Sequence, residues 1–183
     1  MDAADLLTSR ARLTPDREAL LELETGRRYT YGELNGRANR LANWMLNLGV
    51  SYGDRVSILA PNSVVYVDLL YGLAKIGAVF APLNWRLAAP ELVYIINDCL
   101  PEVMIVGPEF ADLWAEIEPQ VTVPHVINLA APTPTANSYE SGLAKASAAE
   151  PHSALHTPHS ALSGESTHCI LSHPARPAGP RAR

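Results

Sequence analysis

Histidine and cysteine side chains concentrate near the C-terminal end of the chain, where their number could suit a metal ion. They are His152, His156, His159, His168, Cys169 and His173. On a helix, spacings of four and three would place the first three on one side, as in many zinc sites. Pro158 interrupts that stretch, and a zinc site also needs a folded frame. We therefore interpret these residues as a compositional feature and assign no metal ligand; a zinc-binding tail is kept as an alternative.

His125 is the only histidine before residue 150, so it is the only candidate base for a Ser-His-Asp arrangement there. Its neighbours, VPHV at 123–126, are typical of a strand edge rather than a catalytic loop. No serine stands in a G-x-S-x-G motif, which a hydrolase elbow requires. We assign no catalytic residue.

Two charged residues lie within the apolar stretch 64–83, which has about the length of a bilayer span. At a helix centre Asp68 and Lys75 would each cost roughly 2.5–3.5 kcal/mol on insertion. Gly77 would also break the span. We predict a buried helix followed by a buried strand and no membrane span, with Asp68 and Lys75 on a partly solvated helix edge rather than in a catalytic pair.

The loop NWRL at 84–87 follows a predicted buried strand. Arg86 there could bind an anion or tie the loop to the next helix, and we favour the structural role. Phosphate loops are absent, since neither G-x-G-x-x-G nor G-x-x-x-x-G-K-[ST] occurs. We assign no cofactor-binding residue and expect this chain to bind no cofactor.

The elements that must position these residues alternate between strands and helices. Strands are predicted over 19–23, 28–31, 56–60, 78–83, 103–106 and 121–129, and helices over 31–48, 63–76, 90–100 and 109–117. Such alternation is typical of an α/β fold with a mainly parallel sheet and flanking helices.

Helix ends are also marked in the sequence. Thr30 and Glu33 have the spacing of a capping box. Gly49 and Gly77 stand where left-handed residues would end the first two helices, and Ser63 could cap the second.

Composition excludes several functional classes. A net charge of −5 gives no electrostatic support for a nucleic-acid partner. The two cysteines, Cys99 and Cys169, exclude a disulfide scaffold and suit a reducing compartment. The N-terminus holds no apolar run of signal-peptide length. We expect a cytoplasmic protein.

Composition also divides the chain into residues 1–150 and 151–183. The second part contains no aromatic residue and repeats the pentapeptide PHSAL at 151–155 and 158–162. No strand or helix period survives in it, so we predict a low-complexity, disordered C-terminal tail.

Within the first part, an ordered series of motifs resembles the adenylate-forming, AMP-dependent synthetase/ligase superfamily. YTYGEL at 29–34 resembles its first core motif, and GDRV at 53–56 with PNS at 61–63 resembles the next strand and loop. LAKIGAVFAPLN at 73–84 resembles the second core motif. NWRL at 84–87 and ELVYIIND at 91–98 are similar to acyl-CoA synthetases in particular.

The resemblance implies a parent reaction in two steps: adenylation of a carboxylic acid by ATP with Mg, then thioester formation with CoA. It also implies that residues 1–150 are a partial N-terminal domain, because family members are roughly three times longer. The family's phosphate loop, acyl pocket, magnesium-binding glutamate, ribose-binding aspartate and C-terminal lysine lie beyond the similar segment, so no site residue is transferred.

The tail carries a trace of that phosphate loop in another reading frame. When 172–182 are written as degenerate codons and shifted by two bases, all ten resulting codons permit T-S-G-T-T-G-R-P-K-G, the form of the family loop. Our hypothesis is that the tail is translated out of frame from around residue 150.

We therefore predict a truncated acyl-CoA synthetase, cut off before its ATP loop and itself inactive. Its apolar faces, left exposed, would permit self-association. The alternative is a non-catalytic interaction module that binds a full-length relative.

Overall fold

A four-stranded parallel sheet lies at the centre of the chain. In the computed structural model, which describes residues 3–130 and 138–151, the strands run in the order β4-β3-β5-β6. Their bounds are β3 (Arg55–Leu59), β4 (Val79–Pro82), β5 (Val103–Val106) and β6 (His125–Asn128). All three neighbouring pairs are parallel. The predicted α/β fold class is confirmed.

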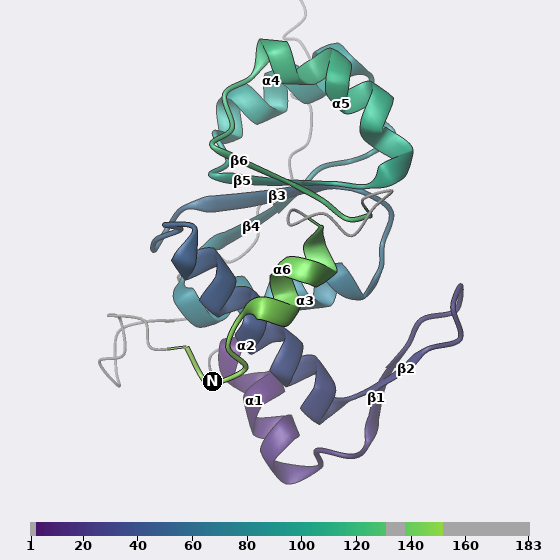
Figure 1. Ribbon diagram of the computed structural model, residues 1–183, viewed down its shortest axis with the longest axis vertical. Coiled ribbons are helices and arrows are strands. Elements are labelled where there is room, and N and C mark those ends of the chain that lie inside the picture. The colour runs from purple at the N-terminus through teal and green to yellow at the C-terminus, as the bar shows by residue number, and fades with distance from the viewer. Residues whose placement is uncertain (1–2, 131–137, 152–183) are drawn as a thin grey trace, which may run out of the picture.

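Helices cover both faces of this sheet (Figure 1). One face packs against α2 (Tyr31–Asn47) and α3 (Val64–Ile76), and the other against α4 (Ala89–Cys99) and α5 (Ala111–Ile117). Short 3-10 turns, η1 (Pro108–Phe110) and η2 (Glu118–Gln120), flank α5.

The strands divide their side chains between two apolar cores. In β5, Val103 and Ile105 join the core under α2 and α3, whereas Met104 and Val106 join the core under α4 and α5. Successive side chains of a strand point to opposite faces, so a run of apolar residues is needed to fill both cores. This is why these strands have continuous apolar sequences rather than alternating ones.

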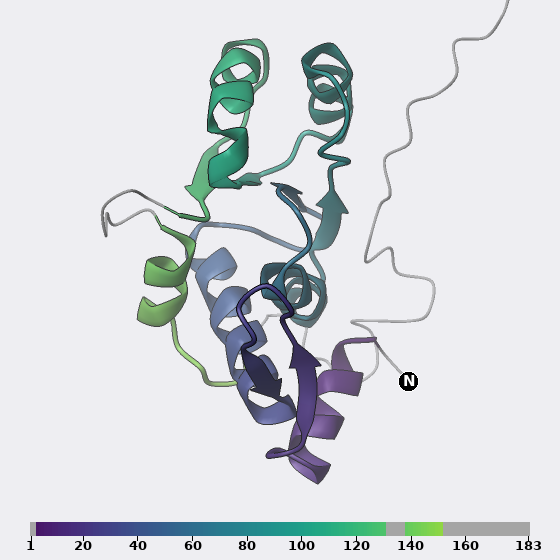
Figure 2. The ribbon, with the colours of Figure 1, turned by 90° about the vertical axis from the view of Figure 1, so that its right-hand side faces the viewer.

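Both predicted ends of α2 are confirmed. The Thr30 hydroxyl accepts a hydrogen bond from the Glu33 N–H at 3.2 Å, and the Glu33 carboxylate accepts one from the Thr30 N–H at 2.8 Å. Gly49, just past the helix, has a φ of 91°. Before α2, the antiparallel hairpin of β1 (Glu18–Leu21) and β2 (Arg28–Thr30) stands away from the sheet (Figure 2).

The stretch 64–83 forms α3 followed by β4, as predicted. Gly77 ends α3 with a φ of 71°. Ser63 precedes the helix but makes no side-chain cap, so that prediction is wrong: its Oγ is buried without a hydrogen-bond partner among the described residues. Within residues 3–130 and 138–151, no helix is both long and apolar enough to cross a membrane.

Helices α2 and α3 approach each other closely at Gly72. A Cβ placed there would lie 2.8 Å from both the Ala38 carbonyl oxygen and Leu41 Cδ2. Only glycine leaves room for this contact, which brings the polar residues of the two helices within reach of one another.

Two helices were not predicted, namely α1 (Ala3–Leu13) and α6 (Tyr139–Lys145). Both pack on α2, and α1 also contacts α3. Two other elements are shorter than predicted: β6 occupies only the second half of 121–129, and 109–117 divides between η1 and α5. Pro124 immediately precedes β6, and its lack of an N–H explains why the strand starts late.

Candidate functional site

Asp68 in α3 is a buried charged residue, and its side chain is fully inaccessible to solvent. Arg37 of α2 donates to it from Nε at 3.0 Å and from Nη2 at 2.7 Å. The same guanidinium donates to Glu140 of α6 at 2.7 Å, and the Tyr139 hydroxyl donates to Asp68 at 3.0 Å. We call these four residues the Asp68 cluster.

Burial dominates the electrostatics of Asp68 and Tyr139. It raises the pKa of the Asp68 carboxyl to about 6, even though the Arg37 contacts act in the opposite direction. Burial and the neighbouring Asp68 charge raise the pKa of Tyr139 well above its ordinary value. Burial lowers the pKa of Arg37, but hydrogen bonds to Glu140 and Asp68 outweigh it and raise that pKa overall.

Lys75, also in α3, belongs to a second polar contact. Its Nζ donates to the Thr8 hydroxyl of α1 at 2.6 Å and to the Glu150 carboxylate at 2.7 Å. Only 3% of the Lys75 side chain is exposed. The prediction that Asp68 and Lys75 lie on a partly solvated edge is wrong: α1, α2, α6 and the residues after α6 cover that edge. Asp68 and Lys75 contact different residues: Arg37, which also binds Glu140, binds Asp68, whereas Thr8 and Glu150 bind Lys75.

The loop after β4 makes local contacts. The Asn84 side-chain oxygen accepts a hydrogen bond from the Arg86 N–H at 3.1 Å, and the Arg86 guanidinium lies 4.6 Å from the centre of the Trp85 ring. Among the described contacts, the Arg86 guanidinium stacks on Trp85 and makes none of the expected links to the next helix.

Of the six histidines, only His125 lies within the described residues. His125 begins β6 and pairs with Val103, as its strand-edge sequence predicted. The tail residues from His152 to His173 lie outside the described residues, so the zinc alternative is untested. In the described part of the chain, no three His, Cys, Asp or Glu side chains gather closely enough to hold a metal ion.

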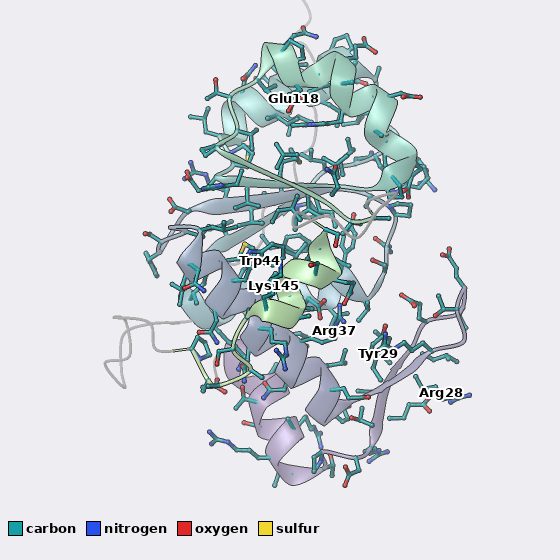
Figure 3. All side chains as sticks on the ribbon, viewed as in Figure 1. Arg28, Tyr29, Arg37, Trp44, Glu118 and Lys145 are labelled. Carbon is teal, nitrogen blue, oxygen red and sulfur yellow. The ribbon has the colours of Figure 1, made fainter. Side chains whose placement is uncertain are left out.

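Figure 3 labels Arg37 and Trp44 beside α6, with Tyr29 on the hairpin. The Arg37 guanidinium lies 5.9 Å from the Tyr29 ring, and Trp44 packs against Tyr139 with ring centres 5.8 Å apart. Sequence reasoning missed Arg37, Glu140 and Tyr139 because these partners are far apart in the chain. The sequence pattern nearest to them is the four-residue spacing of Tyr139 and Leu143. It spans a single helical turn and is too short to predict a helix.

Arg37, Asp68 and Lys75 thus bind the chain's own groups. These contacts connect α1, α2 and α3 with residues 139–150.

The family model described as "AMP-binding enzyme" matches residues 7–171. The chain belongs to this family. Among relatives, the long-chain-fatty-acid–CoA ligase FadD13 of Mycobacterium tuberculosis is 42% identical over 122 residues, covering 67% of this chain and 24% of that protein. A feruloyl-CoA synthase of Amycolatopsis is 42% identical over 108 residues, covering 59% of this chain and 22% of that protein.

Two solved structures have a similar fold. The N-terminal domain of FACL13 from Mycobacterium tuberculosis aligns with a TM-score of 0.74 and 38% identity, covering 82% of this chain and 38% of that one. A Mycobacterium tuberculosis fatty acyl CoA synthetase aligns with a TM-score of 0.78 and 35% identity, covering 93% and 32%. The resemblance to the N-terminal part of acyl-CoA ligases is therefore confirmed, and the chain spans about a quarter of the length of the relatives it matches.

Proposed function

We propose that residues 1–150 are the partial N-terminal domain of an acyl-CoA ligase whose whole-length reaction adenylates a carboxylic acid with ATP and then forms a thioester with CoA. The observation that carries this proposal is the 42% identity to FadD13 over 122 residues, together with the structural match to the N-terminal domain of FACL13. FadD13 is named a long-chain-fatty-acid–CoA ligase, and another solved structure that aligns with this chain is named a fatty acyl CoA synthetase.

We further propose that the 183-residue chain does not catalyse this reaction. The charged residues of α2 and α3 support the proposal because they are engaged by the chain's own groups: Arg37 by Asp68 and Glu140, and Lys75 by Thr8 and Glu150. ATP, Mg and CoA belong to the whole-length reaction, and we assign none of them a residue here. The low cysteine content, two residues in the whole chain, also favours a cytoplasmic location.

The test is ATP–pyrophosphate exchange with the purified chain and a panel of fatty and aromatic acids. A whole-length ligase assayed beside it is the positive control. We expect no exchange above that of a buffer blank with the chain alone. Acid-dependent exchange that grows with chain concentration would overturn the proposal of inactivity while leaving the family assignment intact.

We propose that the reading frame changes from around residue 150, after the segment that packs on α2 and α3. The contacts of residues 138–150 with α2 and α3 support an in-frame origin for the residues before this point. The match to the family model reaches residue 171, so the point of change is to be sought between codons 150 and 172. Sequencing the gene and translating it in all three frames tests this. A second frame that encodes T-S-G-T-T-G and continues as an open reading frame supports the proposal. The absence of such a frame overturns it.

A further inference from the structure

Residues 138–150, which we call the strap, comprise Ser138, α6 and the five residues after it. They lie along α2 in Figure 1, and α6 contacts that helix. The strap is about a hundred residues away from α2 in sequence, with separations of 103 to 111 between bonded residues. Polar contacts as well as apolar packing join α2 to the strap.

Three polar side chains of α2 bind the main chain of the strap. Arg40 donates to the carbonyl oxygens of Ala144 and Ala146 at 3.3 and 2.6 Å. Asn43 donates to those of Ser147 and Ala149, both at 2.9 Å. Asn39 donates to that of Ala148 at 3.0 Å. Asn43 stands three residues after Arg40 and four after Asn39, so it lies beside both of them on the surface of α2.

The carbonyl contacts are consecutive after α6. The oxygens of residues 146, 147, 148 and 149 all accept from α2. Residues 146–149 belong to no helix or strand, so their carbonyls must find donors elsewhere, and α2 supplies them as a row. This is recognition of a polypeptide backbone by side-chain amides and a guanidinium, in place of a neighbouring strand.

Side-chain anchors stand at both ends of this row. At one end, Tyr139 is fully buried and Glu140 pairs with Arg37 at 2.7 Å. At the other end, Glu150 pairs with Lys75 at 2.7 Å. Between them, Gly142 lies so close to the Trp44 ring that a Cβ could not be accommodated. The contacts of the strap therefore require particular side chains at its two ends and a glycine at position 142 within α6.

We propose that this face of α2, with Arg37, Asp68 and Lys75, is a polypeptide-binding site whose ligand is the strap, and that the strap binds it without needing a covalent connection. The remainder of the chain and the strap are then two pieces that complement each other. A peptide of the strap sequence supplied separately occupies the same site once the internal strap has been exchanged.

The test starts from the full chain, with residues 131–137 replaced by a seven-residue recognition sequence for a site-specific protease. After cleavage, we expect the two pieces to elute together on size exclusion in native buffer and to separate in denaturant. We also expect an excess of unlabelled synthetic peptide 136–151 to displace a fluorescent copy of that peptide from the cleaved protein. Separation of the pieces in native buffer overturns the proposal.

Matched variants separate backbone recognition from general packing. Asn43→Leu removes two donors to strap carbonyls, and we expect it to weaken peptide binding about tenfold, as the loss of two hydrogen bonds implies. Asn97→Leu makes the same change at a remote position, where Asn97 donates to the Gln120 carbonyl oxygen at 3.2 Å, and should leave peptide binding unchanged. Equal affinities for the two variants would overturn the assignment of a backbone-reading face.

A change in the peptide keeps the test decisive if Asn43→Leu fails to fold. Replacing the amide links after Ser147 and Ala149 by esters leaves every side chain in place but makes both carbonyl oxygens weaker acceptors. We expect this peptide to bind the unmodified cleaved protein several-fold more weakly than the all-amide peptide. Identical affinity would show that the α2 amide donors do not contribute to binding, and the proposal would fail.

Discussion

The Tyr139 hydroxyl donates a hydrogen bond to the Asp68 carboxylate at 3.0 Å, across 71 residues of sequence, and both side chains are buried. The contact joins the final described helix to α3. Arg37 of α2 also donates to this carboxylate, so two helices supply hydrogen-bond donors to the buried Asp68. Several consequences for stability can be measured.

The first prediction concerns the pH dependence of unfolding. The pKa of Asp68 is raised by burial to about 6, from 3.8 in an ordinary carboxyl, so the native state holds a proton between about pH 4 and 6 that the unfolded state has lost. The contribution of Asp68 to the free energy of unfolding therefore falls as the pH rises through this window. Urea unfolding of the wild type and of Asp68→Asn from pH 4 to 7 measures it.

We expect the stability of the wild type minus that of Asp68→Asn to decrease steadily from pH 4 to pH 7. Using this difference removes most of the contribution of other groups. The groups that face Asp68 are Arg37, Tyr139 and Glu140, and all three remain in the variant. A difference that is constant with pH, or that rises, contradicts the prediction.

The second prediction concerns the Lys75–Glu150 pair. Glu150→Ala leaves the ammonium buried with the Thr8 hydroxyl as its one remaining partner among the described residues. We expect the change to cost about 1–3 kcal/mol of unfolding free energy. Lys75→Met removes the buried charge at similar volume, and it should change stability by less than about 1 kcal/mol. Chemical denaturation ranks the two. A larger cost for Lys75→Met would show that the ion pair itself, rather than the desolvated lysine, dominates.

The third prediction uses two glycines. Gly72→Ala places a Cβ against the Ala38 carbonyl and Leu41, so we expect a loss of about 1–3 kcal/mol through separation of α2 and α3. Gly36→Ala is the matched control, because a Cβ in that part of α2 meets nothing within 4 Å. The control should gain about 0.5–1 kcal/mol from helix propensity. Thermal unfolding that moves both variants in the same direction would contradict this account.

The fourth prediction concerns the N-terminal end of α2. Thr30→Ala removes the acceptor for the Glu33 N–H and should cost ~1 kcal/mol. Thr122, an exposed residue between η2 and β6, provides the comparison. Thr122→Ala should change stability by no more than about 0.5 kcal/mol. Equal midpoints of urea unfolding for the two variants would mean that the capping box does not limit stability.

Sequence reasoning worked where the deciding contacts were local. The strand pattern of 103–106, the capping box at Thr30 and the glycine after α3 depend on neighbours within a few residues, and the structure confirms all three. It failed for Asp68 and Lys75. Their partners in α6 and at Glu150 come from the far end of the described chain, and no local pattern reports which segment will cover a charged helix face.

Missing α1 and α6 has a related cause. α6 contains seven residues and presents only Tyr139, Gly142 and Leu143 as buried positions, which is too short a period to distinguish from a loop. Its stability comes from α2 rather than from its own sequence. The family resemblance indicates the relationship to the N-terminal part of a ligase, which local patterns do not, because it depends on the order of motifs along the chain.

The distance between α2 and the strap along the chain also has a consequence for synthesis. Arg40 and Ala146 are separated by 106 residues, which a ribosome takes about 5–20 s to add at typical rates of elongation. During that interval the row of donors on α2 has no strap to bind. The nascent chain thus presents an open binding face for seconds before its own ligand exists, and an early competitor would meet that face before residue 146 has been made.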